Sequence, residues 1–252
     1  MNDAVSKPTV VVCNDLPTLS REAARLVRGS AAAAIEARQR WSLALAGGST
    51  PRMLYELLAA PTEPMDAIDW SRTQLFFGDE RTVPPDHRDS NYGMALQALL
   101  SRAPIAAGNV HRMKGEAVDL DAAAIEYEGQ LRQFTESAEG VLDLAILGMG
   151  ADGHTASLFP GTTALDEWQR LCVPVTVAKL GTRRLTLTYP VFLRARAVLF
   201  LIAGADKADS LRAVLEGPER PRDLPSQAII RRRAGSVSIL CDRTAAGALG
   251  AT

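Results

Sequence analysis

Asp152 and His154 are the residues whose types and spacing most directly indicate catalysis in this chain. They lie in ILGMGADGHTASLFPG (146–161), where an apolar run ends in three glycines. An imidazole with an ordinary pKa near about 6.5 can take a proton from water at neutral pH and return it later. A nearby carboxylate can hold its tautomer and stabilise the imidazolium. A capping Asp beside an exposed loop His has the same spacing, so both interpretations stand at this point.

A glycine turn followed by a helix start, AGGSTPRMLYELL (46–58), has the composition of an anion-binding loop. Ser49 or Thr50 is expected to cap the helix, and the proline that follows suits its first turn. Gly47 and Gly48 let backbone amides turn outward, and the helix dipole adds positive charge that suits a phosphate. An ordinary strand-to-helix turn would use the same residues, so this feature alone does not distinguish an anion-binding loop from such a turn.

Charged residues follow two further apolar runs. Asp79 and Arg81 open FFGDERTVPPDHRDSNYGMA (76–95), where two prolines and a serine cap predict a long, shaped loop of the kind that contacts substrates. Arg184 and Lys207 are candidate anion ligands. Arginine offers a bidentate fork, and Lys207 is predicted in the first turn of a helix, where a cation is unfavourable without an anion to meet.

No metal or cofactor site is expected. His87 and His111 show no metal-ligand spacing to His154, and solvated histidine is the default interpretation for both. GMGADG (148–153) matches the dinucleotide fingerprint in form. However, Asp152 would bring a negative charge against a pyrophosphate, and no long helix follows.

These residues must be positioned by alternating strands and helices. Strands are predicted over 9–13, 42–46, 74–77, 141–147, 184–188, 197–203 and 236–241. Helices are predicted over 19–38, 51–60, 91–102, 120–137 and 207–216. Most of the strands are continuously apolar, which suits a doubly wound, mostly parallel α/β sheet with helices on both faces. Polar and apolar residues alternate in RLTLT (184–188), so this strand is expected at an edge of the sheet or with one face exposed to solvent. In such a sheet the turns that follow parallel strands converge on one edge. Four turns should meet there, those after the strands at 42–46, 74–77, 141–147 and 197–203.

Composition limits the class of protein. The 252 residues carry a formal net charge of −1, which disfavours nucleic acid and anionic membrane as partners. Three cysteines without framework spacing, and no signal-peptide pattern or membrane-length apolar run, predict a soluble cytoplasmic protein with reduced thiols. We expect one domain over 1–252, a frayed tail at 244–252, and a monomer or small homo-oligomer.

Four segments together resemble the signature blocks of the 6-phosphogluconolactonase family. They are LALAGGSTPRMLYELL, LFFGDERTVPPDHRDSNYGMA, LAILGMGADGHTASLFPG and RRLTLTYPVFLRARAVLFLIAGADKADSLRAVL, in that family's order from about residue 42 to 216. The resemblance implies a fold shared with glucosamine-6-phosphate deaminase and ribose-5-phosphate isomerase. It also implies hydrolysis of 6-phospho-D-glucono-1,5-lactone, a step of the oxidative pentose phosphate pathway, without metal or cofactor.

The resemblance also implies roles for individual residues. His154 is the acid–base and Asp152 its partner, while Asp79 and Arg81 lie beside the lactone. The substrate and phosphate ligands implied are Gly47, Gly48, Ser49, Thr50, Asn91, Arg184 and Lys207. Because Arg183 precedes Arg184, either could face the ligand.

Two other functions stay open on this scaffold. A deaminase or sugar-phosphate isomerase is disfavoured because SLFP stands where the deaminase relatives usually have Asn-Glu-Pro after the DGH block. A sugar-phosphate sensor would keep the anion site without catalysis, but the chain has no spare length for an output domain.

Overall fold

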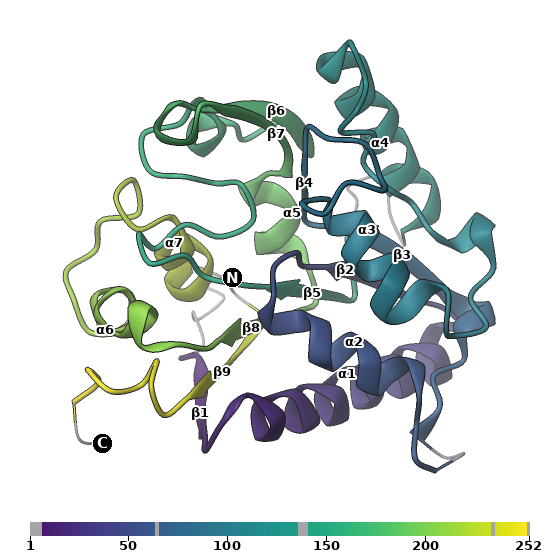
Figure 1. Ribbon diagram of the computed structural model, residues 1–252, viewed down its shortest axis with the longest axis horizontal. Coiled ribbons are helices and arrows are strands. Elements are labelled where there is room, and N and C mark those ends of the chain that lie inside the picture. The colour runs from purple at the N-terminus through teal and green to yellow at the C-terminus, as the bar shows by residue number, and fades with distance from the viewer. Residues whose placement is uncertain (1–6, 64–65, 136–140, 233–234, 251–252) are drawn as a thin grey trace.

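The main sheet has six parallel strands, in the order β1-β9-β8-β5-β2-β3 (Figure 1). The structure is a computed structural model that describes residues 7–63, 66–135, 141–232 and 235–250. The strands are β1 (Thr9–Cys13), β2 (Trp41–Leu45), β3 (Thr73–Phe77), β5 (Leu144–Leu147), β8 (Ala197–Ile202) and β9 (Ser236–Asp242). The predicted parallel α/β sheet is therefore confirmed.

Helices cover both faces of this sheet, as predicted. They are α1 (Leu16–Arg38), α2 (Thr50–Ala59), α3 (Asn91–Ala95), α4 (Leu120–Phe134), α5 (Tyr189–Arg194), α6 (Ala208–Leu215) and α7 (Pro225–Arg232). Successive strand residues point to opposite faces, so Leu43 and Leu45 join the core under α1–α3 while Ala44 joins the core under α4–α7. In Figure 1, α1 and α2 lie below the sheet, and α5 and α7 lie above it.

A small antiparallel sheet was not predicted. Its order is β4-β7-β6, and its strands are β4 (Asp79–Arg81), β7 (Thr182–Leu187) and β6 (Cys172–Val177). The prediction of a loop from residue 79 was wrong for these three residues, because a strand so short shows no periodicity. Neither alternative predicted for RLTLT, an edge position or one face exposed to solvent, was correct: β7 is the central strand of the small sheet, and its last three residues are buried.

Several helix predictions needed correction. The helix predicted over 91–102 is α3 followed by a π-helical turn, Leu96–Leu100. Lys207 ends a short 3-10 turn, Ala205–Lys207, and α6 begins at the next residue. The short helices α5 and α7 were missed. α4 ends at Phe134, and positions 136–137 of the predicted helix lie outside the described residues.

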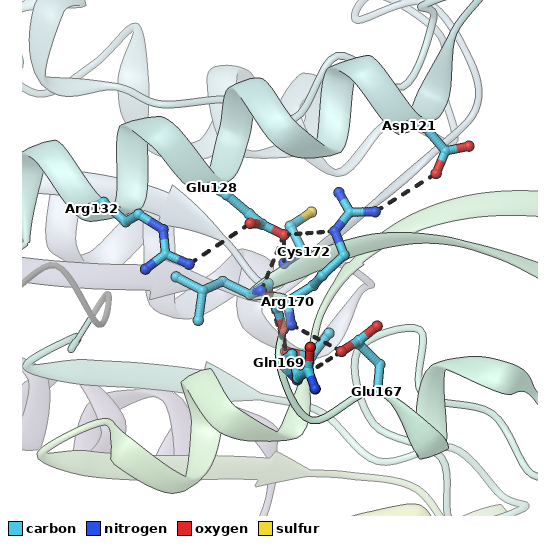
Figure 2. A network of polar contacts seen from close by, with 9 residues as sticks. Asp121, Glu128, Arg132, Glu167, Gln169, Arg170 and Cys172 are labelled. Atoms are coloured by element: carbon cyan, nitrogen blue, oxygen red, sulfur yellow. Dashed lines mark hydrogen bonds and ion pairs between the residues drawn. The ribbon is translucent and has the colours of Figure 1, made fainter.

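A carboxylate network joins α4 to the small sheet (Figure 2). Glu128 Oε1 accepts hydrogen bonds from Arg170 Nε at 3.1 Å and from the backbone amides of Leu171 and Cys172 at 3.1 and 3.2 Å. Arg132 approaches the other carboxylate oxygen at 3.9 Å. Because Cys172 opens β6, α4 fixes where the small sheet begins.

The described part of the C-terminal tail and the three cysteines are packed into the fold. Ala245 is buried, and the Gly250 amide donates to Glu216 Oε1 at 2.9 Å, so the described part of the tail packs against the fold. Residues 251 and 252 lie outside the described residues. Cys13, Cys172 and Cys241 are buried free thiols. No helix in the described part of the chain is both long and apolar enough to cross a membrane.

Candidate active site

A cavity of about 810 Å³ lies at the carboxyl ends of the main-sheet strands. Its wall includes Gly47–Thr50 after β2, Gly78 after β3, Gly148–Asp152 after β5 and Ala203 after β8. The four turns that the sequence predicted to converge therefore do so, in the place where open α/β sheets bind ligands.

His154 and Asp152 form a hydrogen-bonded pair in this wall. His154 Nδ1 lies 2.5 Å from Asp152 Oδ1, and the same oxygen accepts the His154 backbone amide at 3.2 Å. The imidazole also stacks on the Phe159 ring, with 3.9 Å between centroids. An aspartate that accepts from Nδ1–H leaves Nε2 as the basic nitrogen of a neutral imidazole.

The electrostatic surroundings keep His154 neutral. Burial lowers its pKa to about 4; the Asp79 carboxylate opposes this shift, while Lys207, Arg184 and Arg81 add to it. At neutral pH the imidazole is therefore unprotonated and can accept a proton from water.

The backbone of the loop is shaped to hold this pair. A Cβ on Gly150 would lie 2.1 Å from His154 Cε1 and Nδ1, so only glycine admits the ring in this position. Gly153 has φ +74, and a Cβ there would meet Leu224 at 2.6 Å. Ala156 has φ +48, an unfavourable conformation for alanine that the surrounding structure holds.

Asp79 is buried between two loops. Its Oδ2 accepts from Ser157 Oγ at 2.5 Å and its Oδ1 from Asn91 Nδ2 at 3.1 Å. Asn91 Nδ2 also donates to the Asp79 carbonyl at 2.8 Å. The Asn91 side chain lies against Gly47, where an added Cβ would come 1.8 Å from its Oδ1. Asp79 thus links the histidine loop, the glycine turn and the start of α3.

Arg81 and Arg184 are cross-strand neighbours on β4 and β7, and both line the cavity. Each has a buried Nε without a hydrogen-bond partner among the described residues. Burial, followed by repulsion from Arg81, lowers the pKa of Arg184. Arg183 is exposed and does not line the cavity, so Arg184 is the residue that faces it. Two half-buried guanidinium groups held side by side can bind an anion.

Glu80 organises the segment between these arginines and α3. It is 2% exposed and accepts from the backbone amides of Arg81 at 2.7 Å and of Asn91 and Tyr92 at 2.8 Å each, and from Ser90 Oγ at 3.1 Å. Burial raises the pKa of its carboxyl, and the amide hydrogen bonds oppose that rise. Ser90 caps α3 as predicted, by accepting from the Gly93 amide at 3.0 Å.

Lys207 and the glycine turn line the cavity together. Lys207 Nζ pairs with Asp206 Oδ2 at 2.7 Å and is partly exposed. Gly48 has φ +92, a conformation that favours glycine. Ser49 occupies the N-cap position of α2, but its side chain makes no capping hydrogen bond, contrary to one predicted alternative.

Two cavity residues that bear on His154 were not predicted from the sequence, and the environment predicted for one histidine was wrong. Lys179 and Phe159 line the cavity, and Lys179 gave no local signal because the strand before it was not predicted. His87 is exposed, as expected. His111 is buried, not solvated: it stacks between Phe76 and Phe134 at 4.7 and 4.4 Å, and its Nε2 lies 2.7 Å from Gln74 Oε1. Its isolated position in the sequence carried no sign of this aromatic sandwich.

The family model, the sequence relatives and the solved structures that this chain resembles all indicate the same family. Residues 14–239 match the model of glucosamine-6-phosphate isomerases/6-phosphogluconolactonase. A 6-phosphogluconolactonase of Nostoc sp. is 42% identical over 82% of this chain and 85% of its own. The structure of 6-phosphogluconolactonase from Trypanosoma cruzi superposes with a TM-score of 0.82 at 29% identity, covering 98% of this chain and 100% of that one. A monomeric glucosamine-6-phosphate deaminase shares the fold, with a TM-score of 0.79 at 23% identity over 95% of this chain and 99% of the other.

Proposed function

The chain belongs to the family of glucosamine-6-phosphate isomerases and 6-phosphogluconolactonases, and from this we propose that it hydrolyses 6-phospho-D-glucono-1,5-lactone to 6-phosphogluconate. Its enzyme class is 6-phosphogluconolactonase, a lactone hydrolase. The deaminase alternative has less support, because its structural relative is similar in fold alone.

In the proposed reaction, His154 Nε2 takes a proton from a water molecule as the water oxygen attacks the lactone carbonyl carbon. The tetrahedral intermediate then collapses, the bond between that carbon and the ring oxygen breaks, and His154 returns the proton to the ring oxygen. Asp152 holds the tautomer and stabilises the transient imidazolium. No covalent nucleophile is needed, because the strained ester reacts readily with water.

Cations around the histidine supply the remaining electrostatics. We assign Arg184 and Lys207, together with the turn at 47–50, to the phosphate, and Arg81 to the developing oxyanion. The phosphate lies away from the reacting bond, so its binding energy orients the ester against His154. A bound dianion also offsets the cations that depress the basicity of His154.

One observation carries this proposal: a neutral, aspartate-bonded imidazole shares a cavity with two half-buried arginines whose buried Nε atoms lack hydrogen-bond partners within the described ranges. The reaction needs a base for water, a cation for the developing oxyanion and cations for the phosphate, and this arrangement supports assigning His154, Arg81 and Arg184 to these three roles.

The test measures proton release from fresh lactone, with spontaneous hydrolysis subtracted. Wild-type protein should accelerate ring opening, and His154→Ala should lose that acceleration; turnover that survives in His154→Ala would remove this residue from the mechanism. Lys207→Ala should impair the phosphorylated lactone far more than gluconolactone, and an equal loss on both would count against its phosphate role. Ammonia release from glucosamine 6-phosphate would support the deaminase instead.

A further inference from the structure

Lys179 has no part in the reaction proposed above, yet it is joined to both partners of the catalytic histidine. Its Nζ forms an ion pair with Asp152 Oδ2, the carboxylate oxygen that does not face His154 Nδ1. The same Nζ lies 4.9 Å from the centroid of the Phe159 ring, on which the imidazole stacks. Lys179, Asp152, His154 and Phe159 therefore form one connected cluster in the cavity wall.

The β6–β7 hairpin fixes the direction of this lysine. Lys179 lies in the 3-10 turn Ala178–Leu180, which joins the two strands just after the paired residues Val177 and Thr182. Gly181 closes the turn with φ +60. The side chain is 51% exposed, so packing does not account for its position over the cavity. The ion pair and the ring contact are the interactions that hold it there.

We propose that Lys179 is a positioning residue that holds the Asp152 carboxylate, so that Oδ1 accepts the Nδ1 hydrogen of His154 and Nε2 is left as the base. This inference rests on the proposed function, because it acts through the base of that reaction. An Asp152 carboxylate tied at Oδ2 has one free oxygen for the imidazole and cannot turn away from it.

The ion pair also sets how strongly Asp152 favours the charged imidazole. The charged groups that face His154 come from every element around it: Asp152 after β5, Asp79 and Arg81 on β4, Arg184 on β7, Lys207 before α6 and Lys179 between β6 and β7. The Lys179 charge offsets that of Asp152. Without it, the carboxylate stabilises the imidazolium more strongly, so the pKa of His154 should rise from its low value.

The experiment follows the ring nitrogens of the three histidines by NMR as pH is varied. Lys179→Met should raise the pKa of His154 by about half a unit or more, because an opposite charge next to Asp152 is removed at a partly exposed site. The acid limb of the pH profile of kcat/KM should move upward by the same amount. Lys179→Arg keeps the charge and should titrate like the wild type.

The matched control is Lys114→Met, which removes a lysine of similar exposure that pairs with Glu126 outside the cavity and should leave His154 unchanged. A Lys179→Met protein whose His154 titrates like the wild type overturns the proposal, and so do equal shifts in Lys179→Met and Lys179→Arg. Lys179→Gln provides a second neutral variant if Lys179→Met does not fold. The titration requires no lactone, so it decides on Lys179 even if the protein fails to open the lactone ring.

Discussion

Replacing Gly150 with alanine should reduce kcat by about 100-fold without unfolding the protein. The added Cβ would lie 2.1 Å from His154 Cε1 and Nδ1, whereas ordinary contact begins at 3.4 Å, so the imidazole must move by about 1.3 Å. A displacement near 1 Å at a reacting group costs about two orders of magnitude in rate, or roughly 3 kcal/mol in the barrier.

The backbone itself should accept alanine at this position. Gly150 does not have a positive φ, and its amide and carbonyl keep their hydrogen bonds to His154 and Gly153. The imidazole side chain is partly exposed to the cavity and can yield toward it. The substitution should therefore lower kcat more than it lowers the free energy of unfolding.

The assay is steady-state proton release from the lactone, combined with thermal unfolding of each variant. Gly129→Ala on α4 is the control, since its Cβ meets nothing within 4 Å: it should leave kcat unchanged and raise the stability by up to about 1 kcal/mol, because alanine favours a helix more than glycine does. A Gly150→Ala enzyme with wild-type kcat would refute either the close packing of this glycine against the His154 ring or the role proposed for that ring.

Three further predictions concern pH and stability. Because the folded pKa of His154 is about 4, kcat/KM should rise as pH increases through about 4 and stay level to neutrality; a profile that instead rises near the ordinary histidine pKa would contradict its burial. Burial also lowers the pKa of His111 to about 4. The unfolded chain therefore binds this proton first as pH falls from about 6.5, and up to roughly 3 kcal/mol of unfolding free energy is lost by pH 4. Urea titrations should show a smaller loss over that range in His111→Gln, and identical losses would refute this. Glu128→Ala should lower the free energy of unfolding by about 2–4 kcal/mol, because it leaves Arg170 Nε and two backbone amides without their acceptor, and an unchanged urea unfolding curve would show that the network contributes little.

The parts of the site that could be predicted are those next to main-sheet strands. Their apolar runs are long enough to identify, and the carboxyl ends of parallel strands meet at one edge, so Gly47–Thr50, His154 and Lys207 could be placed together from residue order alone. Resemblance implied Asn91 as a substrate or phosphate ligand, which stays a prediction, and its hydrogen bonds to Asp79 became visible only in the folded chain.

The remainder depends on pairing between distant segments. β4 has three residues, too few for a period of two, and β6 contains a proline that argues against a strand in sequence reading. His111 lies between Phe76 and Phe134, residues from two elements whose meeting no local pattern encodes. Tertiary contacts therefore determined the structure of these segments, where local sequence signals were weak or absent.

The two sheets contribute different chemistry to the same cavity. The main sheet supplies the imidazole and the glycine turn, and the small sheet supplies Arg81 and Arg184. Two like charges on adjacent strands repel, so the arginines are held together by the fold rather than by each other. The β-ladder and the Glu128 bonds to β6 provide that constraint. The Nε atoms of both arginines lack a partner in the part of the chain described, and the proposed function supplies one to each: the developing oxyanion to Arg81 and the phosphate to Arg184.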